Sequence, residues 1–383
     1  MRITIVSRIF APEPGAASLR LKSLVEALGQ AGARVDVLTT APPKTVGAPA
    51  DISARVSRWP VLRDKSGYVR GYLQYMSFDI PAFFRVLFHT KLDALVVEPP
   101  PTTGFFVRLA AALRRAPYIY FAADIWSDAA GSTGAASWIV SGVRTLEKFA
   151  LSGAAHVIAV SDAVADRVKA LAPSAAVTVV GHGVDTRLFT PNGEVPPEPA
   201  DIVYVGTASE WHGARVGLEA VISVLSANPQ ATAAFIGQGS EWPELRRIAE
   251  RSSVASRVRF LSTVPPEEAA MWLRAARASI ATLKPGLGYD FAVPTKIYSS
   301  LASGTPVAYA GPDPVRTMVS ENGLGVATEY NASLLAEQLA QLIDGRREFD
   351  SESLRAWTQD NVSATAIAGR AAVAIAECVR HDD

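Results

Sequence analysis

The sequence predicts an α/β protein in which two doubly wound, Rossmann-like parallel-sheet domains face each other across a cleft. Three observations lead to this prediction. Short, β-branched apolar segments alternate with segments of helical period, and this rhythm restarts after a proline-rich stretch at 191–199. The chain has 383 residues, about the length of two domains. Its hydrophobic content of 49% is sufficient for two buried cores.

Composition and charge exclude several classes of protein. The 37 basic residues are balanced by 37 acidic ones, so no overall field favours nucleic acid as a partner. The single cysteine, Cys378, cannot form an internal disulfide, which indicates a reducing, cytoplasmic environment. The segment Met1–Val6 leads directly into a strand pattern without the features of a signal peptide. Since no run of about 18 apolar residues occurs, we expect at most peripheral contact with the inner face of the plasma membrane.

The first half begins with a βαβ pattern. A strand at 3–6 is followed by a turn-rich loop, a helix over about 18–31 and a strand at 35–39. No G-x-G-x-x-G motif is present, so a dinucleotide site is not predicted. The loop that contains Gly15 and Ala16 precedes a helix, where it could hold a phosphate or serve as a plain connection.

Residues 55–91 differ from the rest of the chain because seven basic and two acidic residues give them a net charge of +5. Eight aromatic residues are interleaved with these charges. Such a segment suits a membrane interface or an anionic lipid head group. The alternative is a solvated helix pair whose aromatic side chains lie in the core.

One further strand of the first half precedes candidate ligand-binding positions. The strand at 118–121 is followed by Asp124, and a carboxylate at the carboxyl end of a parallel strand is well placed to meet a ligand. Capping of the next helix is the structural alternative for Asp124, and Asp128 is a weaker candidate. The expected strands of this half beyond 35–39 are 94–97, 118–121, 156–160 and 177–180.

Proline and glycine between Pro191 and Pro199 indicate a linker. We therefore predict a first domain over 1–190, a linker over 191–200, a second domain over 201–362 and a final helix over 363–383. The expected strands of the second half are 202–205, 232–236, 258–261, 278–281, 307–310 and 325–327.

The stretch Asp290–Val307 predicts a loop, a short helix and a buried strand. Pro294 suits the first turn of the helix, Thr295 is a possible cap, and Gly304 ends the helix. Lys296 lies in the first turn, where its ammonium group and free backbone N–H groups could hold a diphosphate. An ordinary loop and helix is the alternative interpretation.

The pattern Pro-x-Lys-x-x-x-x-Leu-Ala-x-Gly-x-Pro over 294–306 resembles the nucleotide-sugar helix of family 4 glycosyltransferases of the GT-B fold. The segment Ala123–Asp128 is similar to an Asp-Leu-Trp-Pro-type element of the subgroup that builds bacterial cell-surface polysaccharides. The segment Gly181–Phe189 resembles the end of the family's first domain, with His182 where asparagine is usual.

This resemblance implies retaining transfer of a sugar, a hexose or an N-acetylaminosugar, from a nucleotide-sugar such as a UDP- or GDP-sugar. The implied acceptor is a bacterial envelope glycan or a lipid-linked intermediate, and neither a metal nor a resident cofactor is expected. The C-terminal helix is expected to return to the first domain.

The resemblance also implies roles for individual residues. Lys296 and His212 are expected on the diphosphate, Ser299 on the ribose and Asp124 near the reacting centre, while Gly15 and Ala16 line the acceptor side. The remaining nucleotide-side candidates are Gly206, Thr207, Arg215, Gly237, Gln238, Gly239, Leu261, Val264 and Thr295.

Several positions depart from the family pattern. Thr207 and His212 stand where arginine and lysine are usual, and Phe291 and Ser299 where two glutamates are usual. His212 can carry charge when protonated, and Arg215 is a candidate to supply the missing charge. These departures motivate an alternative, a catalytically impaired protein that binds a nucleotide or a partner. A nucleotide-sugar epimerase of the same fold is a third possibility.

Overall fold

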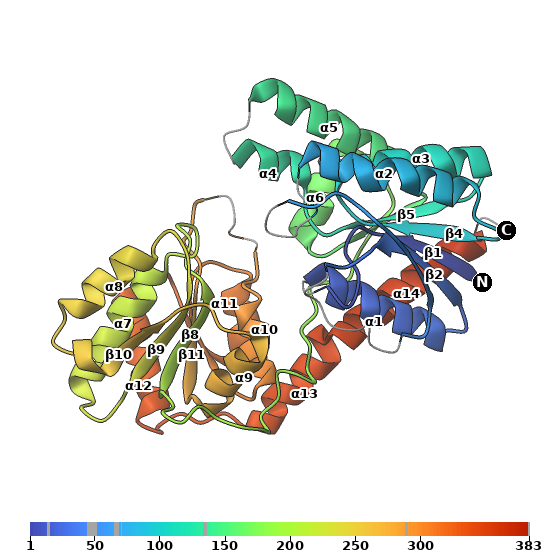
Figure 1. Ribbon diagram of the computed structural model, residues 1–383. Helices are drawn as coiled ribbons and strands as arrows, with labels where there is room; N and C mark the ends of the chain where they lie inside the picture. The colour runs from blue at the N-terminus through green and yellow to red at the C-terminus, as the bar shows by residue number, and fades with distance from the viewer. Residues whose placement is uncertain are drawn as a thin grey trace. The chain divides into compact units, whose positions relative to one another are not determined.

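The computed structural model describes residues 1–13, 16–43, 52–64, 69, 71–132, 136–287, 290 and 292–381. The chain divides into two compact units, Met1–Gly183 with Ala364–Asp383, and Val184–Ser363 (Figure 1). Each unit is built on a parallel sheet with helices on both faces, as the alternation of apolar strands and amphipathic helices predicts. The predicted α/β class and the pair of Rossmann-like sheets are confirmed.

The described residues of the first unit form a seven-stranded parallel sheet in the order β3-β2-β1-β4-β5-β6-β7. The strand order reverses between β1 and β4, and ligands of such sheets bind outside the carboxyl ends of the strands at this reversal. The strands are β1 Arg2–Val6, β2 Arg34–Thr40, β3 Arg55–Trp59, β4 Ala94–Val97, β5 Tyr118–Ala122, β6 His156–Ala159 and β7 Val177–Val179.

Helices cover both faces of this sheet. Apolar side chains of α1 and α14 form one core with the strands, and those of α2, α3, α5 and α6 form the other (Figure 1). Arg370 of α14 donates a hydrogen bond to the Val180 carbonyl at 2.9 Å, which ties the C-terminal helix to the first unit. The helices are α1 Ala16–Gln30, α2 Tyr72–Leu87, α3 Pro101–Arg114, α4 Trp126–Ser132, α5 Ser137–Ser152, α6 Asp162–Leu171 and α14 Ala364–His381.

The second unit repeats the plan with a six-stranded parallel sheet in the order β10-β9-β8-β11-β12-β13, counted over its described residues. Helices α7, α8 and α12 pack on one face, and α9, α10, α11 and α13 on the other. Its strands are β8 Ile202–Thr207, β9 Ala233–Gln238, β10 Val258–Leu261, β11 Ala278–Thr282, β12 Val307–Ala310 and β13 Gly325–Thr328. Its helices are α7 Ala214–Ala227, α8 Trp242–Glu250, α9 Pro266–Ala275, α10 Lys296–Ala302, α11 Val315–Glu321, α12 Ala332–Ile343 and α13 Ser351–Val362.

The segment between the two sheets is held on the second unit. The guanidinium group of Arg274 donates hydrogen bonds to the carbonyl oxygens of Thr190 and Glu194, at 3.0 and 2.9 Å. The Val184 N–H group donates to the Val362 carbonyl at 2.9 Å. The division therefore falls at residues 183 and 184, and not within the proline-rich stretch 191–200.

Strand β3 and helix α13 are elements that the sequence pattern did not predict. In β3 every second side chain is exposed, so the segment lacks the continuous apolar run that identifies a buried strand. Its basic and aromatic residues also continue into the helix that follows, so composition does not separate the two elements. Helix α13 begins at a cap, because the carboxylate of Asp350 accepts a hydrogen bond from the Ser353 N–H group at 2.8 Å. No helix within the described residues has the length and apolarity needed to cross a membrane.

Candidate functional site

A pocket of about 510 Å³ opens at the carboxyl end of β8 in the second unit, beside the reversal of strand order between β8 and β11. Its wall combines the end of β8, the loop that follows and the start of α10. Six predicted site residues line it: Gly206, Thr207, His212, Thr295, Lys296 and Ser299.

A second hollow of about 110 Å³ adjoins the first and shares Gly206 and Thr207 with it. Three predicted residues line it, namely Gly237, Gln238 and Val264. Leu261, also predicted, packs against the apolar cluster beneath and lines neither hollow.

The turn after β9 requires glycine because the backbone approaches the neighbouring loop closely. Gly237 has φ +147° and Gly239 has φ +145°. A side chain on either would collide with backbone atoms, those of Gly206 in the first case and those of Ala208 in the second. The glycines therefore permit close packing of the two loops, and Gly237 leaves main-chain groups at the edge of the smaller hollow.

Lys296 supplies the positive charge of the pocket. It is the first residue of α10, and its ammonium group donates to the Thr207 carbonyl at 3.3 Å and lies 3.6 Å from the centroid of the Tyr204 ring. The ion pairs among the described residues do not include Lys296. Burial without a carboxylate partner lowers the pKa of Lys296 to about 7. The site holds a cation whose charged form an anionic ligand would stabilise.

His212 is buried against Trp211, with the ring centroids 3.5 Å apart. Its Nδ1 accepts a hydrogen bond from the Ser209 N–H group at 3.1 Å, which places the proton of the neutral ring on Nε2. Burial, with the nearby Lys296 charge as a second cause, lowers the pKa of His212 to about 3. The imidazole is therefore neutral near pH 7, where it can donate one hydrogen bond.

Not all of the other predicted residues in this unit lie in the pocket. Ser299 lines the pocket, and Thr295 stands at the N-cap position of α10 without making a capping hydrogen bond through its side chain. Arg215 lies on α7 with 61% of its side chain exposed, pairs with Glu219 at 2.7 Å and lines neither hollow. In this structure Arg215 does not supply the charge that an arginine and a lysine would bring to the pocket.

Asp124 belongs to the first unit and follows β5 with an exposed side chain. Partial loss of hydration at this position raises the pKa of the Asp124 carboxyl group, and the positive charge of Arg20 opposes the shift. Asp124 is not the cap of α4. The buried carboxylate of Glu147 accepts hydrogen bonds from the Trp126 and Ser127 N–H groups at 2.7 and 3.0 Å, which leaves Asp124 available to a ligand.

The remaining residues singled out from the sequence complete the account. Asp128 forms a two-bond ion pair with Arg167, with both distances 2.7 Å. Ala16 is the first residue of α1, whereas Gly15 and Phe291 lie outside the described residues. In the part of the chain that the structure describes, no group of three or more His, Cys, Asp or Glu side chains is placed to hold a metal ion.

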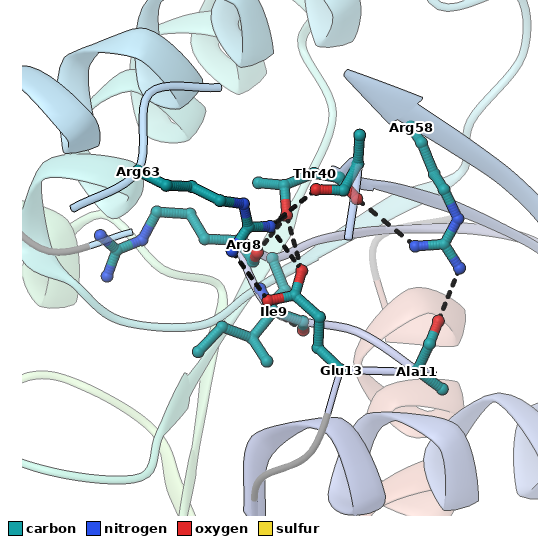
Figure 2. A network of polar contacts seen from close by, with 9 residues as sticks. Arg8, Ile9, Ala11, Glu13, Thr40, Arg58 and Arg63 are labelled. Atoms are coloured by element: carbon teal, nitrogen blue, oxygen red, sulfur yellow. Dashed lines mark hydrogen bonds and ion pairs between the residues drawn. The ribbon is translucent and has the colours of Figure 1, made fainter. Parts of the chain in front are cut away.

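A buried polar network at the carboxyl edge of the first sheet escaped sequence analysis (Figure 2). Arg63 donates to both carboxylate oxygens of Glu13, at 2.7 and 3.0 Å, and Thr40 Oγ1 lies 3.1 Å from Glu13 Oε1. Arg58 donates to the Ala11 carbonyl at 2.6 Å. Glu13 lies between two prolines in the loop after β1, but its partners are up to 50 residues away, so no local pattern revealed the network.

Comparison with protein families matches both halves of the chain. Residues 15–183 match a glycosyl transferase 4-like domain, and residues 199–345 match the glycosyl transferases group 1 domain. The D-inositol 3-phosphate glycosyltransferase of Corynebacterium efficiens is 31% identical over 187 residues, which are 44% of this chain and 43% of that protein. The match therefore spans less than half the length of this curated relative.

Solved structures share the fold over nearly the whole chain. The sucrose-phosphate synthase of Thermosynechococcus elongatus has a TM-score of 0.70 at 17% identity, covering 99% of both chains. HepE of Anabaena, solved in complex with UDP, has a TM-score of 0.67 at 16% identity, covering 98% of this chain and 100% of that one. At these identities the likeness establishes the GT-B fold.

Proposed function

We propose that this chain, which belongs to the family 4, group 1 glycosyltransferases, is a retaining transferase that moves a sugar from a nucleotide-sugar to a bacterial envelope glycan or lipid-linked acceptor. The observation that supports this proposal best is the half-buried ammonium group of Lys296 in the pocket at the end of β8. A cation without a carboxylate partner is suited to the diphosphate of a nucleotide.

The chemistry of the proposed reaction requires stabilisation of a leaving nucleoside diphosphate. Negative charge develops on the diphosphate as the bond to the sugar breaks, and a fixed donor at that position lowers the barrier. Lys296 supplies the charge, and the Nε2–H of His212 supplies a neutral hydrogen bond. The main-chain groups of Gly206 and Gly237, which line the two hollows, are available to the nucleotide, and the Ser299 hydroxyl to the ribose. This arrangement calls for no metal ion.

The acceptor side is assigned to the first unit. Asp124 is the proposed residue near the reacting centre, where a carboxylate with a raised pKa would accept a hydrogen bond from an acceptor hydroxyl or a sugar hydroxyl. Replacement of Asp124 by Asn is expected to lower kcat strongly and leave nucleotide affinity within about twofold, which is measured by transfer assays and calorimetry. Unchanged turnover would remove Asp124 from this role.

The first experiment is calorimetric titration of the purified chain with UDP, GDP, ADP and dTDP separately. UDP is the nucleotide bound in the HepE structure, which makes it the first to test. One nucleotide that binds clearly better than the others would support the pocket as the donor site and fix the donor class. Absence of binding by all four would overturn the proposal.

A second candidate function is a protein of the same fold that binds a nucleotide or a partner without transfer. The observation in its favour is that Lys296 is the one cation among the described residues that line the pocket, because His212 is neutral. Tight binding of a nucleotide-sugar with neither hydrolysis nor transfer to any acceptor would favour this candidate. Conversion of the nucleotide-sugar alone into its epimer would instead identify an epimerase.

A further inference from the structure

Six phenylalanine rings form a continuous ladder across the outer side of helices α2, α3 and α5 in the first unit. Neighbouring rings along the ladder lie 5.1 to 6.5 Å apart, centroid to centroid. Figure 1 shows the three helices together on one side of the sheet. The rings, in order of contact, are Phe88, Phe84, Phe83, Phe106, Phe105 and Phe149.

Two rings of this ladder, Phe84 and Phe88, are exposed, and the other four are partly buried. On α2 a stripe of large apolar side chains at helical spacing points outward, and Phe88, directly after the helix, is 75% exposed. Trp138 at the start of α5 is 77% exposed. We call this surface the phenylalanine face; its exposed apolar residues are Leu73, Ile80, Phe84, Phe88, Leu109, Leu113, Trp138 and Ile139.

The charges on the same three helices are of one sign at the surface. The basic residues are Arg85, Arg108, Arg114, Arg144 and Lys148, and the only acidic residues in these helices are Asp79 and Glu147. Both carboxylates are buried and engaged, Asp79 by the Thr103 hydroxyl at 2.6 Å and Glu147 by the first N–H groups of α4. Arg144 and Lys148 are exposed and lie one helical turn apart.

We propose that the phenylalanine face docks on the surface of a lipid bilayer that contains anionic phospholipids. Aromatic and aliphatic side chains would enter the interface, and the exposed Arg144 and Lys148 would meet the lipid phosphates, since Arg108 and Arg114 donate to main-chain carbonyls of the same unit. A second copy of the chain is a poorer occupant, because two such faces would bring positive charges together without carboxylates between them. The excess of positive charge therefore favours an anionic bilayer over a second copy of the chain.

The structure also refines which residues carry this contact. Of the segment 55–91, Arg58 and Arg63 are engaged inside the unit with Ala11 and Glu13, so they are not available to lipid phosphates. Arg85 donates to the Ser57 carbonyl at 2.6 Å. The surface contributed by this segment is its second part, α2 and Phe88, and α3 and α5 complete the face.

The proposal is tested by sedimentation of the full chain with vesicles of phosphatidylcholine, alone or mixed equally with phosphatidylglycerol. No donor or acceptor is present, so the result is independent of sugar transfer. We expect the wild-type chain to bind the anionic vesicles and to be released by salt. Phe84→Ser with Phe88→Ser is expected to weaken binding about 30-fold or more, since each ring contributes apolar burial.

The charge contribution is tested separately. Arg144→Gln with Lys148→Gln is expected to weaken binding to the anionic vesicles roughly 20-fold and to change binding to phosphatidylcholine little. Matched controls are Leu334→Ser with Val373→Ser and Arg246→Gln with Arg251→Gln, at exposed positions in or directly after other helices. Circular dichroism establishes that each variant is folded.

Three outcomes would overturn the proposal. The first is a wild-type chain that does not sediment with anionic vesicles. The second is vesicle binding that the phenylalanine and charge variants leave unchanged. The third is a dimer in analytical ultracentrifugation that the phenylalanine variant abolishes, which would assign the face to a second copy of the chain.

Discussion

The carboxyl ends of both parallel sheets carry cationic side chains, but these side chains have different partners in the two units. In the first unit, Arg20 pairs with the buried Glu98 at 2.7 Å and Arg63 pairs with Glu13 at 2.7 Å. In the second unit, Lys296 is held by a carbonyl oxygen and an aromatic ring. Carboxylates neutralise Arg20 and Arg63 at the first edge, whereas Lys296 at the second has no carboxylate partner among the described residues and its charge is open to a ligand.

This difference indicates separate purposes for two similar folds. A buried ion pair with satisfied hydrogen bonds fixes loop geometry, and removal of one partner leaves an uncompensated charge. A partly buried cation without a carboxylate partner destabilises the empty protein but gains most from an anionic ligand. We therefore expect mutations at the first edge to change stability and mutations at the second to change nucleotide affinity.

The largest effect on binding is expected for Lys296→Met. Loss of the ammonium group removes a charge-assisted contact with the diphosphate, so affinity for the nucleoside diphosphate is expected to fall about 100-fold. Arg215→Met is the matched control and is expected to stay within about twofold, because that side chain is exposed and paired with Glu219. Calorimetry measures both. Equal losses in the two variants would contradict the assignment of the pocket's charge to Lys296.

At the first edge, Glu13→Ala is expected to lower the free energy of unfolding by about 3 kcal/mol, since it leaves the Arg63 guanidinium group without its carboxylate. Urea unfolding monitored by circular dichroism measures this loss. Glu219→Ala breaks an exposed ion pair and is expected to cost about 0.5 kcal/mol or less. Nucleotide affinity should persist in both variants. A Glu13 variant as stable as the Glu219 variant would show that the network in Figure 2 contributes little.

The pH dependence of nucleotide binding should report the pKa of Lys296. The empty site has a pKa of about 7, and a bound diphosphate raises it, so the protonated form binds more tightly. Affinity is expected to fall as the pH rises from about 7 to about 8.5, by up to about tenfold per unit. Calorimetry at several pH values measures the slope, and proton uptake on binding gives a second readout. A flat profile, or a slope that persists in Lys296→Met, would contradict this assignment.

The smallest effect is expected at His212. Because the ring is neutral, His212→Gln keeps a hydrogen-bond donor and should weaken nucleotide binding by a factor of about three, whereas His212→Ala should cost about tenfold, or roughly 1.4 kcal/mol. Acidification from about pH 7 to about pH 5.5 should not strengthen binding through His212, since its pKa is about 3. Stronger binding at the lower pH that His212→Gln removes would show that the imidazole is charged.

The sequence alone determined the class of fold and the main elements. Apolar runs such as Ala94–Val97 and Ile202–Val205 identify buried parallel strands, because a strand covered on both faces is apolar throughout. Local spacing also located Lys296 at the start of a helix. It placed the loop Gly206 to Gly213 at the pocket, and the turn Gly237 to Gly239 beside the smaller hollow, at strand ends. These features depend on short stretches of chain, and short stretches carry their own periodicity and turn signals.

Only the tertiary structure decided which side chains are charged and which of these charges are available to a ligand. The neutral state of His212 depends on Trp211, Ser209 and Lys296 around it, and the position of Arg215 depends on the face of α7 that turns outward. The capping of α4 by Glu147 and the Glu13 network join residues 20 or more positions apart. Burial and ion pairing are properties of neighbours in space, and the order of residues along the chain does not state which distant side chains become neighbours.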